Sequence, residues 1–367
     1  MRFNFCGEIK AVEDQEKKGY FYRRDTTSGG DTYHRVNLRV ASAKNNSAFI
    51  ELFGMENDIM TRDSDNGNLT VPWEDRNDAD VIKSVASYKQ FHILDKTYIA
   101  AADVCTFIKE HIDELKNGKY AVTGQTQLNE YNGKFSDQYM ISNIYSVDED
   151  RKQDLLVTTQ FFFTADSFDD EDWKSDKRLY INGWTQEYFK KSESEKGMYY
   201  YPRTIVFDCS KVNFEDKKQV AQVVWRLKQI GCESKGGTIK CKLNKKNVYE
   251  IPIKCRYING AEEIQFDESE LSDNQKEAIE LGIMTLEDCI PKDKKVYGQR
   301  ITELRLFNYD LSGDFADGCK EATDTKDEFE EKILSVSSSD DDDDFSKNMN
   351  PPTGDDDEVT TSIDDLF

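Results

Sequence analysis

The stretch Tyr33-His-Arg-Val-Asn-Leu-Arg-Val40 decides the fold class of this chain. Its apolar residues alternate with polar and charged ones, and successive side chains of a β-strand point to opposite faces. One face of the predicted strand therefore carries Val36, Leu38 and Val40. The other carries Tyr33, Arg35, Asn37 and Arg39.

A second strand follows a turn at Asn45-Asn46 and continues the same pattern. Ala48, Ile50 and Leu52 extend the apolar face, while Phe49 and Phe53 fall opposite. The two strands are expected to pair. They would then present arginines and aromatic rings together on one exposed surface.

The rest of the first half predicts a small β-domain with one helix. A strand begins at Arg2, and a charged loop covers 13–31. No regular element is predicted for 55–102, and a helix capped by Asp103 ends at Gly118. Strands are predicted at 119–128 and 135–147. This order of elements is that of an OB-fold, which binds ligands on its second and third strands, although several small barrels and sandwiches share it.

The second half repeats this order after the charged run 148–154. Strands are predicted at 155–163, 179–189 and 198–207, a helix capped by Asn213 at 214–230, and strands at 238–243 and 248–257. Ser272-Asp-Asn-Gln275 predicts a capping box for a short helix to Ile283. One more strand, 296–307, has no place in either barrel.

The predicted fold is mostly β with a few helices (α+β), as tandem OB-like β-barrels plus a disordered acidic tail. The expected domains are 1–150 with an insertion at 55–102, 151–320 with a helical extension, and the tail 321–367.

Charge is segregated along the chain. The net charge of −23 is unusual for a nucleic-acid binder. Residues 321–367 hold 17 acids and 3 bases, however, which leaves 55 acids and 46 bases in the body. A local basic groove is therefore compatible with the composition.

Eight cysteines occur without a C-x-x-C pair, and no N-terminal apolar segment or long apolar run is present. We therefore expect reduced thiols, no membrane segment and a cytoplasmic protein, located in the host cytoplasm if the chain is phage-encoded.

Three clusters combine positive charge with flat aromatic surface, as single-stranded nucleic acid requires: cations for phosphates and ring faces for unpaired bases. The first cluster comprises Lys17, Lys18, Tyr20, Tyr22, Arg23, Arg24, Tyr33, Arg35, Arg39, Phe49 and Phe53. The second comprises Tyr180, Trp184, Tyr188, Tyr201 and Arg203. The third lies within 226–256 and is centred on Lys240, Lys242, Lys245 and Lys246.

Each cluster has a structural alternative. Tyr180, Trp184 and Tyr188 are also consistent with core residues, because aromatic alternation is common in strands. The insertion 55–102 could cover Phe49 and Phe53, and the basic stretch 226–256 could be a solvated face.

The sequence contains no positive indication of catalysis, a cofactor or a metal. Asp63-Ser-Asp-Asn-Gly67 resembles a calcium loop only superficially, because its glycine is one place early. The cysteines lack zinc-ligand spacing, and the three histidines show no partner pattern.

The C-terminus contains acidic runs at 340–344 and 355–358 and ends Ser362-Ile-Asp-Asp-Leu-Phe367. Such composition predicts disorder. The ending resembles that of phage and bacterial single-stranded DNA-binding proteins, whose acidic tails end in Asp-Asp, an aliphatic residue and Phe. The bacterial type usually has Pro where this chain has Leu366. A tail that serves only solubility is the alternative.

The resemblance and the clusters together imply sequence-independent binding and protection of single-stranded DNA during replication, recombination and repair. The tail would regulate DNA binding and recruit replication or recombination proteins through Asp364, Asp365, Leu366 and Phe367. A non-enzymatic scaffold or virion-associated interaction protein is the main alternative, and an unrecognised enzyme such as a nuclease is the other.

Overall fold

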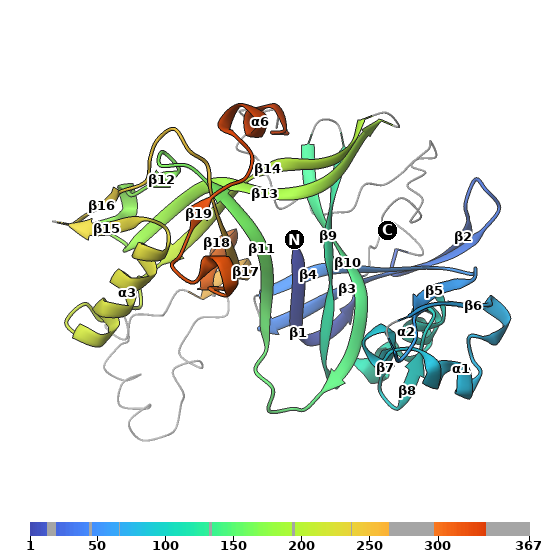
Figure 1. Ribbon diagram of the computed structural model, residues 1–367. Coiled ribbons are helices and arrows are strands. Elements are labelled where there is room, and N and C mark those ends of the chain that lie inside the picture. Colours follow the sequence, from blue (N-terminus) through green and yellow to red (C-terminus); the bar gives the residue numbers. More distant parts are fainter. Residues whose placement is uncertain are drawn as a thin grey trace, which may run out of the picture.

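The computed structural model describes residues 1–12, 20–43, 46–65, 67–131, 134–192, 195–235, 237–263 and 297–334. The described chain is mostly β-strand with few helices, as predicted (Figure 1). Its strands are β1 (Arg2–Ala11), β2 (Tyr22–Thr26), β3 (Thr32–Ala43), β4 (Asn46–Met55), β5 (Ile59–Arg62), β6 (Asn68–Val71), β7 (Phe91–Ile93), β8 (Lys96–Tyr98), β9 (Lys119–Tyr131), β10 (Lys134–Val147), β11 (Asp154–Phe163), β12 (Phe168–Asp169), β13 (Arg178–Ser192), β14 (Glu195–Asp208), β15 (Cys232–Lys235), β16 (Thr238–Cys241), β17 (Tyr249–Glu263), β18 (Tyr297–Tyr309) and β19 (Lys320–Glu321). Its α-helices are α1 (Ala79–Ser84), α2 (Ala101–Leu115), α3 (Lys217–Gln229) and α6 (Lys326–Glu331).

Strand pairing in the first half forms a closed circuit. β1 pairs with β3, β3 with β4, β4 with β10, β10 with β9, and β9 with β1. Only the β4–β10 contact is parallel. Helix α2 lies between the third and fourth strands of this circuit in the chain, where the sequence predicts it.

The second half repeats the circuit with different strands from those predicted. β11 pairs with β13, β13 with β14, β14 with β18, β18 with β17, and β17 with β11. The predicted strand at 238–243 corresponds to β16, which pairs with β15 outside the circuit. Its place is taken by β18, the strand that sequence reasoning could not assign.

The apolar faces predicted for β3 and β4 form the core of the first circuit. Val36, Leu38, Val40 and Leu52 are fully buried there. Helix α2 packs closely on β4, because a Cβ added at Gly54 would lie 2.2 Å from the backbone nitrogen of Ala102. The packing therefore leaves the opposite face of β3 and β4 outside the core.

The stretch 55–102 is more regular than predicted. It contains β5 to β8 and α1, together with a small apolar cluster built on Val71, Val85 and Ile99. These elements are short, so their periodicity is too brief to be recognised in the sequence.

Helix starts also differ from the predictions. Asp103 does not cap α2; it lies in the first turn and pairs with Arg76 at 2.9 Å. Helix α3 is capped by Asp216 rather than by Asn213. Each predicted cap lies three residues from the actual N-cap, which is Ala100 in α2 and Asp216 in α3.

The two circuits are joined through β1 and through the β13–β14 hairpin, and also where Asn259 of β17 bonds to Asn46 and Ser47 of β4. The first half of β1 pairs with β11, so one sheet runs through both. The β13–β14 hairpin also crosses over β9 and β10 (Figure 1). There Arg203 binds both carboxylate oxygens of Asp137 at 2.6 Å and lies 3.4 Å from Glu187, with only 8% of its side chain exposed.

The expected start of the tail at residue 321 is wrong. Residues 320–334 include β19 and α6 and pack on the second circuit, with Phe329 only 1% exposed. The physical reason is local: Thr325 and Glu328 form a capping box, and Phe329 supplies an apolar anchor. The helix predicted for 272–283 and the remaining tail lie outside the described residues.

Candidate nucleic-acid interface

The outer face of β2, β3 and β4 carries cations and rings in register. Arg23 lies opposite Arg35, and Arg35 lies opposite Phe53, so the three side chains form one row across the strands. Arg39 lies opposite Phe49, four residues from Arg35 along β3 and four from Phe53 along β4. Directly opposed residues share a face, so these groups form a single surface.

Within this surface an arginine lies over one ring, and two other rings stack on each other. The Arg39 guanidinium lies 4.5 Å from the centre of the Phe49 ring. Tyr33 stacks on Phe53 with ring centres 5.3 Å apart and planes inclined by 26°. All four side chains are partly or fully exposed. The surface thus offers positive charge beside accessible aromatic planes, as predicted from the strand pattern.

One carboxylate lies within the same face. Glu51 is 3.3 Å from Arg35, and Gln138 Nε2 donates to it at 3.5 Å. Burial raises the pKa of Glu51, and this effect outweighs the opposing attraction of Arg35. Glu51 offsets the positive charge of Arg35 only when its carboxyl group is ionised, which its burial disfavours.

Two residues of the first predicted cluster lie on the other side of the sheet. Tyr22 bonds to His34 at 2.9 Å and lies under Lys109, whose Nζ is 4.7 Å from the ring centre. Arg24 pairs with Glu56 at 2.8 Å. The Tyr20 carbonyl accepts from Asn37. The strand period places Tyr22 and Arg24 away from Arg35, and Lys17 and Lys18 lie outside the described residues.

The second predicted cluster is divided between two faces. Tyr180, Trp184 and Tyr188 are four residues apart along β13, so they share one face of the strand, the outer face. On that face Trp184 lies opposite Pro202 of β14. Tyr201 instead points toward β10, with its ring centre 5.8 Å from that of Phe135. Arg203 is buried on the same side and bound to Asp137, so the structure does not bring it to the outer face.

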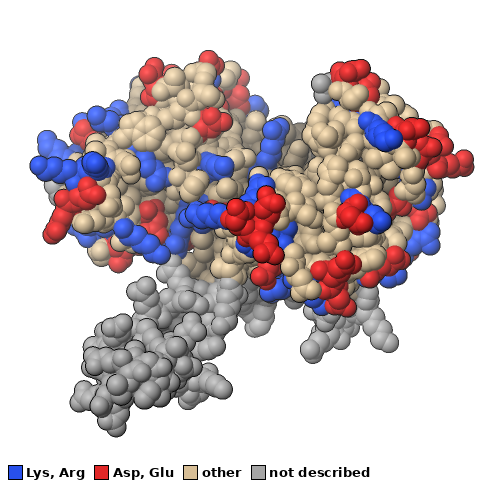
Figure 2. All heavy atoms as spheres, turned by 90° about the horizontal axis from the view of Figure 1, so that it is seen from below, with Lys and Arg blue, Asp and Glu red and all other residues tan. Residues whose placement is uncertain are grey.

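The third cluster is exposed at the far end of the molecule. Lys240 lies on β16, and Lys242, Lys245 and Lys246 follow it. Lys242 pairs with Glu233, and Lys245 with Asp166. Figure 2 shows basic side chains gathered at this end, which in Figure 1 is opposite β2. The first and third clusters are therefore separated by the length of the molecule.

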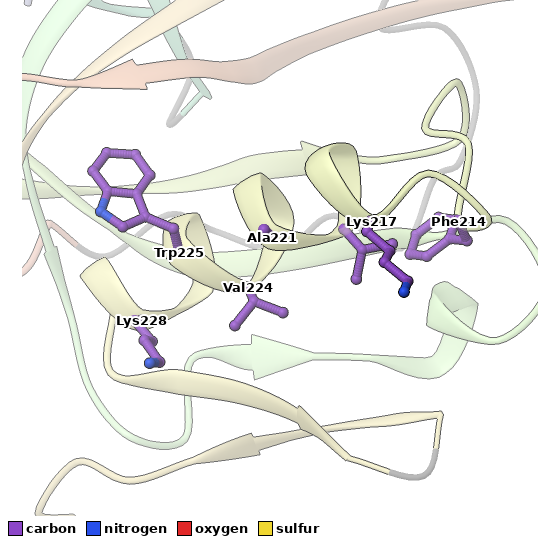
Figure 3. Close-up of a pocket in the computed structure, with 7 residues that line it drawn as sticks. Phe214, Lys217, Ala221, Val224, Trp225 and Lys228 are labelled. Atoms are coloured by element: carbon purple, nitrogen blue, oxygen red, sulfur yellow. The ribbon is translucent and has the colours of Figure 1, made fainter.

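Helix α3 presents an open apolar groove that sequence reasoning did not identify. Figure 3 shows Phe214, Val224 and Trp225 along it, with Lys217 and Lys228 at its rim. Trp225 is 48% exposed. Only Val223, Leu227 and the non-apolar Gln229 are buried in this helix.

Within the described ranges, no group of three His, Cys, Asp or Glu side chains is placed to hold a metal ion. No described helix is long and apolar enough to cross a membrane. Burial raises the pKa of the Cys209 thiol to about 12, so this cysteine stays protonated near neutral pH.

Comparisons with known proteins add only distant likenesses. No family model and no curated protein matches the sequence. The wild-type single-stranded DNA-binding protein from Thermus aquaticus matches with a TM-score of 0.30 and 7% identity, over 85% of this chain and 93% of that one. A deletion mutant of that protein matches with a TM-score of 0.29 and 10% identity, over 70% and 86%. These scores are too low to support an argument, so the proposals below rest on this chain alone.

Proposed function

We propose that this protein binds single-stranded DNA without sequence preference, as a binding protein and not an enzyme. The outer face of β3 and β4 is the observation that carries the proposal. Arg35 and Arg39 are spaced to meet phosphates, while Tyr33, Phe49 and Phe53 offer planes on which unpaired bases can stack. Paired bases are already stacked in a duplex and cannot use these planes.

We further propose that each strand circuit is an OB-type barrel. Two features support this: the order of five strands with a helix after the third, and a single parallel contact that closes each circuit. The proposed domains are 1–150 and 151–320, the second extended by the ordered segment to residue 334. In an OB-type barrel the binding surface lies on the second and third strands, which here are β3 and β4.

The proposed path of DNA includes a second contact region. The lysines at 240, 242, 245 and 246 are exposed and can meet phosphates of a longer strand. Two of them already have acidic partners, so each would contribute less than a lysine without one. Arg203 and Tyr201 are not part of the proposed DNA path, because their side chains contact β10 and so connect the two circuits.

The acidic tail is proposed to regulate binding and to recruit partners. Its acids can compete with DNA for the basic surface, and its last four residues join two acids to an aliphatic and an aromatic side chain. Coating and protection of unwound strands during replication, recombination and repair would follow from these two properties.

The test is a mobility-shift comparison of labelled single-stranded DNA, duplex DNA and RNA, with magnesium present. The proposal predicts a shift of single-stranded DNA, weaker binding of duplex and no cleavage. Absence of any shift would favour a scaffold protein, and cleavage would favour a nuclease.

A further inference from the structure

The two strand circuits differ at their equivalent faces. The outer face of β3 and β4 is open, whereas the outer face of β13 and β14 is covered by residues 320–334, referred to below as the C-terminal cover (Figure 1). This face holds Trp184, the largest ring of the second predicted cluster. The difference calls for a physical explanation.

The C-terminal cover is attached by few backbone bonds. Tyr200 N donates to the Lys332 carbonyl, and Leu334 N donates to the Tyr200 carbonyl, both at 2.9 Å. At its other end, β19 pairs with β17 through two residue pairs. Helix α6 has only six residues, and helices this short are marginal without tertiary contacts. Ala322 N also donates to the Val248 carbonyl at 2.9 Å. None of these bonds belongs to the strand pairings that close the second circuit.

Two buried side chains anchor the cover: Leu334, 1% exposed beside Leu128 and Phe189, and Phe329, which lies in an aromatic pocket. The Phe329 ring centre lies 4.1 Å from that of Tyr200, 5.1 Å from that of Trp184 and 6.2 Å from that of Phe162. Phe329 is 1% exposed, whereas Trp184 is half-buried. Phe329 meets Trp184 edge to face, with the ring planes inclined by 85°, and is tilted by 36° to Tyr200. A flat ring thus occupies a pocket walled by aromatic side chains, the kind of surface on which nucleobases bind.

The cover is also acidic on its outer side. Asp327, Glu328, Glu330 and Glu331 are exposed around Phe329. Asp324 accepts from the Tyr200 hydroxyl at 2.9 Å and pairs with Lys332 at 2.8 Å. The cover thus carries an aromatic ring together with several carboxylates. A single DNA strand carries the same two kinds of group, in its bases and its phosphates.

We infer that the Phe329 pocket is a second nucleobase-binding site, which the C-terminal cover keeps closed until single-stranded DNA displaces it. The inference rests on the proposed function and adds a gated site to it. Short strands would occupy β3 and β4 only. Strands long enough to span both circuits would compete with Phe329 for Trp184.

The first test uses full-length variants and oligomers of about 8 and about 30 nucleotides, chosen from site sizes of roughly 4–16 nucleotides per OB-fold. Phe329→Ala should raise the affinity for the long oligomer at least about fivefold. The affinity for the short oligomer should stay unchanged. Adding Trp184→Ala should remove the gain. Phe307→Ala is the matched control, since that ring is 43% exposed on β18 and contacts Arg256 rather than the cover.

A folded Phe329→Ala variant that binds the long oligomer no tighter than wild type would overturn the gated site. A gain that survives Trp184→Ala would overturn it as well. Failure of wild type to bind either oligomer would remove the proposed function itself, which is a different result.

A second measurement needs no variant. Amide hydrogen exchange of wild type should show faster exchange at 326–334 when the long oligomer is saturating, and no change with the short one. Unchanged or slower exchange with the long oligomer would mean that DNA does not displace the cover.

Discussion

Phe49 and Phe53 lie beside arginines because strands β3 and β4 keep a strict two-residue period. If a base stacks on Phe53, Phe53→Ala should cost about 1–3 kcal/mol of binding free energy and leave the salt dependence nearly unchanged. Arg39→Gln should instead reduce the slope of log K against log salt by about 0.7. Fluorescence anisotropy at several salt concentrations measures both.

Phe307→Ala is the matched control for this pair of variants. Phe307 is 43% exposed and lies under Arg256, but on β18, away from the proposed surface. If Phe307→Ala weakens binding as much as Phe53→Ala does, base stacking at the β3–β4 face is not the cause.

Glu51 links the same surface to pH. Its pKa is raised by burial, more than Arg35 lowers it, so the native state binds more protons than the unfolded state between the ordinary and the raised pKa. Stability should therefore fall as pH rises through that window. Glu51→Gln has no such titration, so its stability relative to wild type should rise as pH increases through the window. Urea unfolding from pH 4 to 8 tests this, and a constant difference across that range would contradict it.

Residue positions on the faces of strands were predictable only where the register was known. The alternation in 33–53 placed Arg35, Arg39, Phe49 and Phe53 correctly, since both strands continue an apolar face. Tyr201 and Arg203 were grouped with Trp184, yet they lie on the opposite face. The register of β13 against β14 is set by the intervening turn, and neither strand's own pattern contains it.

At the scale of elements, the β13–β14 hairpin is fastened to β10 by a buried ion pair. Arg203→Met would leave Asp137 without its ion-pair partner, although Glu187 keeps its pair with the N-terminal amine of Met1, and should cost about 3–5 kcal/mol of unfolding free energy. Arg24→Met is the control: its pair with Glu56 is exposed, and such pairs contribute about 0–1 kcal/mol. Chemical denaturation compares them, and equal losses would show that the buried pair has no special role.

The elements that sequence reasoning misassigned are those whose role depends on distant partners. β16 has an ordinary strand pattern but pairs only with its neighbour β15. β18 closes the second circuit, although residues 264–296 separate it from β17 in the chain. Helix α6 could have been recognised, because Thr325-Lys-Asp-Glu328 is a capping-box sequence. What no pattern indicated was that α6 covers Trp184.

At the scale of the whole molecule, charge is divided between a nearly balanced body and an acidic tail. If the tail only maintains solubility, loss of Phe367 should change neither DNA affinity nor partner binding, since every side-chain charge remains. If it recruits partners, removal of Phe367 should leave DNA affinity nearly unchanged and abolish binding to a replication or recombination protein. A pull-down that compares the intact protein with the protein lacking Phe367 decides this. Equal recovery of partner proteins by both would mean that the tail serves solubility alone.

The central claim is that a cationic, aromatic surface binds unpaired strands. Its most direct test is the affinity of the full-length protein for a single strand of about 30 nucleotides as a function of salt. We predict that log K falls linearly with log salt, by about 0.7 for each phosphate neutralised, and that a duplex of equal length binds more weakly. Affinity that does not change with salt, or equal affinity for the duplex, would contradict the account.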